Sequence, residues 1–298
     1  MSALKNILIS TLIALLVPFH SDGKNQIPNK NAIWLWSTHM KEAPIQEWKD
    51  KGIGHVLLNE AAFWKHEMED VTTFAQECRK AGLKVHVWFQ CFSRDKKWTF
   101  PVDEQTGTLK QDYFDSMTSR AEKYIKAGFD GIHMDYIRFC GNASKYNFPE
   151  TGLSAVGIVN ECCRQMHEAV KVINPDAILS AALMPEINSE HRYGQRPSEM
   201  AQWIDVLMPM IYRWDYYGEN KDDQWVKELT SWFVSNAGEA DVWVGIQTYS
   251  VNTDNKKTTD LKADEILAEY KLVKSAGADG VVLFRHGLGI LPDLREWF

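Results

Sequence analysis

The chain has 298 residues, of which 45% are hydrophobic and 24% are charged, and its formal net charge at pH 7 is −7. This composition is typical of a globular protein and excludes a largely disordered chain. The acidic balance argues against a nucleic-acid partner, because phosphate binding requires clustered lysine and arginine. The twelve tryptophans favour a carbohydrate ligand, because an indole has a large apolar face that can pack against a sugar ring.

The first residues predict an export signal. A short basic region ends at Lys5, and a mostly apolar run follows from Asn6 to Phe19. This run has the length of a secretory signal core and is short for a transmembrane helix. We therefore expect residues 1–22 to be a signal peptide or an uncleaved anchor, residues 23–31 a linker, and residues 32–298 a secreted or periplasmic domain. A membrane would be a partner only if the segment is not cleaved.

Beyond the linker, short apolar runs alternate with longer amphipathic runs. The expected strands are Ala32–Ser37, His55–Asn59, Lys84–Phe92, Gly131–Arg138, Ile178–Met184, Val206–Tyr212, Val242–Tyr249 and Gly280–Arg285. The expected helices are Ile45–Lys51, Glu67–Lys80, Ser116–Lys126, Ser154–Ile173, Ser198–Trp203, Gln224–Ser235, Leu261–Ser275 and Pro292–Trp297. Strands that alternate with helices indicate parallel βαβ units. Eight such strands predict an α/β fold of one closed (β/α)8 TIM barrel.

Four helix-to-strand turns support this barrel, because each contains a glycine that can end a helix in the left-handed conformation. These glycines are Gly52, Gly82, Gly128 and Gly277. A doubly wound open sheet is the alternative architecture. No G-x-G-x-x-G pattern follows the first strand, however, so we expect no nucleotide cofactor.

The strand Gly131–Arg138 contains charged residues where a buried parallel strand is normally aliphatic. Gly131, His133 and Asp135 share one face of this strand, because side chains alternate. A carboxylate at its end is costly unless it is paired or used. If Asp135 has a purely structural role, we expect an ion pair or helix cap that involves Arg138. The position of this strand in a barrel favours a functional one.

In such a barrel the active site lies at the C-terminal ends of the strands. The polar and aromatic residues there predict a substrate-binding rim, which comprises Trp36, Asn59, Glu60, Trp88, Gln90, His133, Arg138, Tyr212, Asp215, Gln247 and Arg285. His86 and His133 are equally well explained as hydrogen-bonded core residues.

Glycoside hydrolysis needs two carboxyl groups across the scissile bond. We expect Asp135 to be the nucleophile, kept ionised by Arg138 or another donor, and Glu186 to be the proton donor. Glu60 and Asp215 are the substitutes if Glu186 points away. No cofactor and no metal are required for this chemistry.

Residues 130–138 (DGIHMDYIR) resemble the DGIHLDYIRYP signature of a family of bacterial glycosyl hydrolases with TIM-barrel domains. Residues 205–212, 244–249 and 279–284 are similar to the later strands of that family. The resemblance implies a carbohydrate-active barrel with Asp135 at the centre of its site. Phe139-Cys140 replaces the usual Tyr-Pro, and no motif identifies the acid, so Glu186 depends on its position after a strand.

Two other functions are compatible with the sequence. A non-catalytic sugar-binding barrel would bind glycans without turnover. A metal-dependent hydrolase would use His39, His86, His133 and Asp135, but such barrels usually supply an H-x-H pair, which is missing here. The five cysteines, Cys78, Cys91, Cys140, Cys162 and Cys163, lack C-x-x-C spacing and are expected to be small buried hydrophobes.

Overall fold

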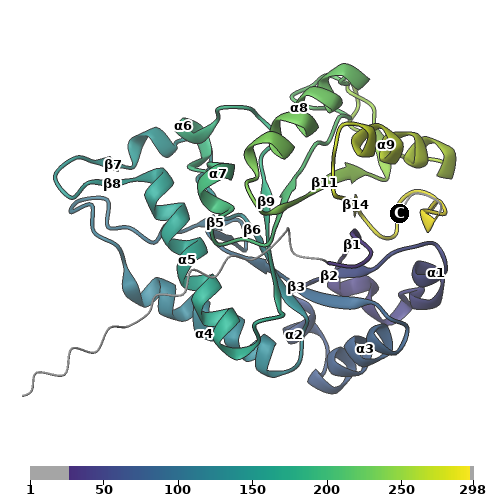
Figure 1. The fold of residues 1–298 in the computed structure, drawn as a ribbon, viewed down its shortest axis with the longest axis horizontal. Coiled ribbons are helices and arrows are strands. Elements are labelled where there is room, and N and C mark those ends of the chain that lie inside the picture. Colours follow the sequence, from purple (N-terminus) through teal and green to yellow (C-terminus); the bar gives the residue numbers. More distant parts are fainter. Residues whose placement is uncertain (1–26, 296–298) are drawn as a thin grey trace, which may run out of the picture.

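The computed structural model describes residues 27–295, and these form a closed barrel of parallel strands surrounded by helices (Figure 1). The strands follow one another around the barrel in chain order, and the last pairs with the first. They are β1 (Asn31–Leu35), β2 (His55–Asn59), β3 (Lys84–Gln90), β6 (Gly131–Asp135), β9 (Ile178–Leu183), β10 (Val206–Pro209), β11 (Asp241–Gln247) and β14 (Gly280–Phe284). The predicted eight-stranded barrel is therefore confirmed.

The longer helices lie outside the barrel and pack their apolar faces against it. They are α1 (Ile45–Asp50), α3 (Met68–Lys80), α4 (Gln111–Lys126), α5 (Ala155–Ile173), α8 (Asp223–Asn236) and α9 (Ala263–Ser275). Short helical segments are η1 (Ser37–Glu42), α2 (Ala62–Lys65), η2 (Ala143–Lys145), α6 (Glu190–Tyr193) and α7 (Pro197–Met200). Helix α4 begins five residues before the predicted Ser116. Residues 292–294 are not helical, and the rest of the predicted last helix lies largely outside the described residues.

Side chains fill the barrel interior below the strand ends. Trp34, Trp88, Met208 and Trp243 belong to this interior cluster and are nearly completely buried. Ile27, from the predicted linker, packs into the same cluster. The predicted signal peptide and the first part of the linker lie outside the described residues. Because the interior is packed, a substrate can only bind at a rim of the barrel.

The interior also holds three neutral histidines. His55 and His86 share a hydrogen bond of 2.9 Å between Nδ1 and Nε2. His133 bonds Ser180 Oγ at 3.0 Å through Nδ1, and its Nε2 accepts the Trp34 indole N–H at 3.1 Å. Burial lowers the pKa of both His55 and His133 to about 3, so both rings are uncharged at neutral pH. The core interpretation of His133 agrees with these contacts.

The two rims of the barrel differ in their loops. The predicted glycine turns enter the strands at one rim, and all four glycines have positive φ: Gly52 84°, Gly82 87°, Gly128 93° and Gly277 99°. The opposite rim has longer loops with three antiparallel hairpins, which the sequence did not predict. These are β4–β5 (Ser93–Arg94, Lys97–Trp98), β7–β8 (Asn147–Phe148, Leu153–Ser154) and β12–β13 (Tyr249–Val251, Thr258–Asp260). The hairpin β7–β8 projects beside α5 and α6 (Figure 1).

Within residues 27–295, no helix has the length and apolar character that a membrane span requires. Cys78, Cys91, Cys162 and Cys163 are buried as expected, whereas Cys140 is exposed.

Candidate active site

Asp135 is the last residue of β6, and two donors fix its carboxylate. Oδ2 accepts the indole N–H of Trp88 at 2.8 Å, and Oδ1 accepts the backbone N–H of Tyr136 at 2.7 Å. Tyr136 has a left-handed φ of 54°, which is uncommon for a residue other than glycine. Its N–H bonds the carboxylate of the preceding residue in this conformation, so local strain accompanies the fixed position of Asp135.

Burial raises the pKa of Asp135 above its ordinary value, while the Trp88 and Tyr136 donors and the charge of Arg138 act in the opposite direction. The carboxylate is therefore poorly hydrated but hydrogen-bonded. Asp135 does not form the ion pair with Arg138 that a purely structural role would require, because no such pair within 4.0 Å occurs among residues 27–295.

Aromatic side chains line the rim around this carboxylate. Trp36 lies 4.8 Å from Trp88 between ring centroids, and the Tyr212 ring stacks on Phe284 at 5.1 Å. The Tyr212 hydroxyl is buried and has no hydrogen-bond partner among the described residues. Burial raises the pKa of this hydroxyl, and the negative charge of Asp135 adds to the effect. These surfaces suit a ligand with both apolar faces and hydroxyl groups.

Two arginines extend this rim. The guanidinium carbon of Arg138 lies over the rings of Trp98, Tyr136 and Tyr193, at 5.0, 5.7 and 5.5 Å from their centroids. The guanidinium carbon of Arg285 lies 5.9 Å from the centroid of Trp36. Both arginines are half-buried.

Glu186 lies in the loop after β9. Its Oε1 accepts hydrogen bonds from the hydroxyls of Tyr193 (2.8 Å) and Tyr217 (2.9 Å) and from Arg192 (3.2 Å). Oε2 is buried and has no partner among the described residues. Tyr193 contacts both Arg138 and Glu186, so it links the Glu186 cluster to the Asp135 rim.

The two substitute carboxyl groups have other partners. Glu60 is 2% exposed and faces helix α4, where it pairs with Arg120 at 2.9 Å and accepts the Tyr124 hydroxyl at 2.9 Å. Asp215 pairs with Lys256 of the β12–β13 loop at 2.7 Å. These contacts give Glu60 a structural role between the barrel and its helices, and they tie the Asp215 loop to its neighbour.

The predicted amides mainly hold the rim loops in place. Asn59 Oδ1 accepts the backbone N–H of Ala61 at 3.1 Å, and Gln247 Oε1 accepts that of Trp214 at 2.9 Å. Gln90 is half-buried, and its carbonyl accepts a hydrogen bond from Arg120.

Sequence reasoning did not assign four rim residues that lie beyond the ends of the barrel strands: Trp98, Tyr136, Tyr193 and Tyr217. Tyr136 could have been found, because it follows Asp135 in the DGIHMDYIR motif. The other three lie in the connections between barrel strands and helices, whose conformations have no local sequence signal.

The four residues of the metal hypothesis do not assemble. His86 and His133 are bonded in the core, and the His39 ring packs edge-on against His286 at 5.9 Å. In the part of the chain that the structure describes, no group of three or more His, Cys, Asp and Glu side chains is arranged to hold a metal ion.

A parallel eight-stranded barrel with polar and aromatic residues at the carboxyl ends of its strands, here including the half-buried Asp135, is characteristic of TIM-barrel enzymes. Residues 71–269 match the family described as "Putative glycosyl hydrolase domain", and the chain belongs to this family. The protein is thus a glycoside hydrolase with a carbohydrate substrate. No curated protein matches the sequence significantly.

Solved structures of glycoside hydrolases share the fold. A family 18 N-acetylglucosaminidase from Paenibacillus barengoltzii aligns with a TM-score of 0.61 at 13% identity, covering 86% of this chain and 95% of that one. A class V chitinase from Pseudomonas fluorescens aligns with a TM-score of 0.65 at 12% identity, covering 87% and 96%. The spore cortex-lytic enzyme SleL of Bacillus cereus aligns with a TM-score of 0.62 at 14% identity, covering 89% and 72%. At these identities the similarity establishes the fold alone.

Proposed function

We propose that this protein is a secreted glycoside hydrolase that cleaves a poly- or oligosaccharide. The carboxyl groups of Asp135 and Glu186 carry out the reaction. The observation that supports this most strongly is the Asp135 carboxylate. It lies at the rim formed by the carboxyl ends of the strands and is held by Trp88 and Tyr136, and the Tyr212 hydroxyl of the same rim is buried without a partner among residues 27–295. A desolvated, oriented carboxylate is the group that glycoside cleavage requires.

In the proposed reaction Asp135 attacks the anomeric carbon while Glu186 protonates the departing glycosidic oxygen. This gives a covalent glycosyl-enzyme and releases the first product. Glu186, now ionised, then removes a proton from water, and the water oxygen displaces Asp135 from the anomeric carbon. Trp88 and Tyr136 stabilise the anionic form of Asp135 in the free enzyme and when it departs.

The role of Glu186 is supported by its position and its free oxygen. It follows β9, which pairs with β6 in a register that places Ser180 opposite His133. Its Oε1 is held by two phenols and an arginine, which leaves the buried Oε2 as the oxygen that can carry the proton. Secretion is supported by the apolar run Asn6–Phe19.

Asp135→Asn and Glu186→Gln test the two roles, with Asp215→Asn as a carboxyl control on the same rim. Release of reducing ends from a panel of oligosaccharides should fall by several orders of magnitude in the first variant. The second variant should lose activity most on poor leaving groups, because it lacks the proton donor. Near-wild-type turnover by Asp135→Asn would contradict the proposal, and saturable glycan binding without turnover by the wild type would indicate a binding protein.

The anomeric configuration of the first product tests the nucleophile separately. Attack by Asp135 requires net retention, which proton NMR of the fresh product detects. Inversion would show that Asp135 acts on water instead of on the sugar.

A further inference from the structure

Two guanidinium groups that flank the Asp135 rim have no carboxylate partner in the described part of the chain. Most other arginines of the described chain are ion-paired: Arg79 with Asp130, Arg120 with Glu60, Arg164 with Glu161 and Glu168, Arg192 with Glu186, Arg196 with Glu190 and Glu199, Arg213 with Asp223, and Arg295 with Asp293. Among residues 27–295, Arg138 and Arg285 have no such pair although the chain carries 40 acidic residues. This suggests that their charge serves something other than the fold.

Both arginines pack against aromatic rings. Arg138 lies among the rings of Trp98, Tyr136 and Tyr193, and Arg285 lies over Trp36. A guanidinium can contact an aromatic ring through its face, and its edge, which carries the N–H donors, then stays available. That edge matches a carboxylate, which it can bind with two parallel hydrogen bonds.

Few of these donors are used within the protein. Within residues 27–295, the Arg138 side chain gives one hydrogen bond, from Nη1 to the backbone carbonyl of Phe139 at 3.1 Å. In the same range the Arg285 side chain gives one, from Nη1 to the backbone carbonyl of His286 at 3.4 Å. A guanidinium has five N–H donors, so most of each group has no protein acceptor among the described residues.

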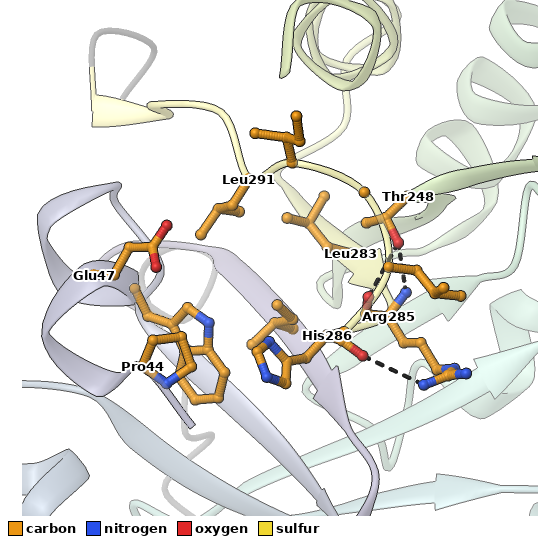
Figure 2. A pocket seen from close by; sticks show the side chains of 13 residues that line it. Pro44, Glu47, Thr248, Leu283, Arg285, His286 and Leu291 are labelled. Carbon is orange, nitrogen blue, oxygen red and sulfur yellow. Dashed lines mark hydrogen bonds between the residues drawn. The ribbon is translucent and has the colours of Figure 1, made fainter. Parts of the chain in front are cut away.

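The backbone also fixes Arg285. The Thr248 hydroxyl accepts the Arg285 N–H at 3.0 Å and lies 3.0 Å from the Arg285 carbonyl, to which it donates. Figure 2 shows these contacts and shows the arginine side chain running away from Glu47 and from the His286 ring. Arg285 also lines the hollow drawn in Figure 2, and its guanidinium lies over Trp36, the ring next to Trp88.

The catalytic carboxylate does not explain two such groups. Arg138 favours the ionised form of Asp135, but the hydrogen bonds to this carboxylate come from Trp88 and Tyr136 and not from either arginine. We propose that the glycan bound at this rim carries carboxylates, as hexuronic acid residues do, and that Arg138 and Arg285 bind the carboxylates of sugars on either side of the cleaved bond. This inference rests on the proposed function, because it places the glycan over Asp135.

The test is binding to Asp135→Asn, which holds the substrate without consuming it, measured by calorimetry. The probes are uronic-acid oligosaccharides of several linkages and the same oligosaccharides with their carboxyls reduced to alcohols. We expect at least one acidic probe to bind more tightly than its reduced counterpart. Adding Arg138→Gln or Arg285→Gln should weaken binding of the acidic probe by about 10- to 100-fold and leave the reduced probe within about 2-fold.

Arg94→Gln is the matched control. Arg94 also lies over an aromatic ring, that of Trp64 at 5.0 Å, and has no ion pair among the described residues, but it contacts none of the aromatic residues around Asp135. It should leave binding of both probes unchanged. Arg138→Lys should recover only part of the lost affinity, because an ammonium keeps the charge without the two-pronged geometry.

Equal affinity for acidic and reduced probes, or equal losses on both in the arginine variants, would overturn this inference. Wild-type turnover of neutral glycans would then leave the hydrolase proposal intact. Selective binding of acidic probes with no turnover of any glycan by the wild type would support the role of the arginines and refute the proposed reaction.

Discussion

The hydrogen bond from Trp88 to Asp135 can be removed with little change in shape. Trp88→Phe deletes the indole N–H that lies 2.8 Å from Oδ2 and keeps an aromatic ring in the barrel interior. A hydrogen bond to a charged group contributes about 1.5–3 kcal/mol. At 1.36 kcal/mol per pH unit, its loss should move the ionisation that limits activity at low pH upward by about 1–2 pH units.

The assay is the pH dependence of kcat/KM, whose acidic limb reports ionisation of the free enzyme. The wild-type limb should lie above the ordinary range of aspartate, because burial raises the pKa of Asp135. In Trp88→Phe it should lie higher still, with the rate on the plateau less affected than the rate at low pH.

Trp34→Phe is the control for loss of an indole in the same interior. Its N–H bonds His133 at 3.1 Å, so the change removes a buried hydrogen bond that does not involve Asp135. It should lower stability and leave the acidic limb in place. An unmoved limb in Trp88→Phe, or equal shifts in both variants, would refute the reasoning that the indole stabilises the carboxylate.

Three further predictions concern charge and metal. Because the folded-state pKa of Asp135 is raised, its charged form destabilises the fold at neutral pH. The variant Asp135→Asn should therefore melt at a higher temperature than the wild type at pH 7 and lose this advantage below about pH 4. An unchanged or lower melting temperature of the variant at pH 7 would contradict this prediction. His55 and His133 have folded-state pKa values of about 3, so acidification from pH 6.5 should lower the free energy of unfolding by up to about 1.4 kcal/mol per pH unit for each residue. In urea titrations, the free energy of unfolding of His133→Asn should depend less steeply on pH than that of the wild type. Equal slopes in the two proteins would argue against a neutral buried His133 ring. Chelators should leave glycan hydrolysis unchanged, and a loss reversed by a divalent cation would revive the metal hypothesis.

The architecture could be predicted because periodicity and turn chemistry agree along the chain. Apolar runs that alternate with amphipathic ones fix strands and helices, and positive-φ glycines such as Gly128 mark the turns between them. Asp135 could be located for a related reason, since a carboxylate at the end of a buried strand contradicts the local pattern. In the structure Asp135 is the last residue of its strand, and its two hydrogen-bond donors are in place.

The rest of the rim depends on information that is not local. His133 shares a strand face with Asp135, yet it lies deeper and is bonded to Trp34 and Ser180. Glu60 directly follows a strand end, but the long-range partners Arg120 and Tyr124 turn it toward helix α4. The position of a residue along its strand predicts its height in the barrel, whereas tertiary packing decides which way its side chain points.

The most direct test of the proposed mechanism is a crystal structure of Asp135→Asn with an oligosaccharide that the wild type cleaves. We expect the anomeric carbon of the scissile bond to lie about 3–3.5 Å from the side chain of residue 135, with a sugar ring against Trp36. A sugar bound elsewhere, for example in the hollow of Figure 2 beside His286 and Trp48, would contradict it.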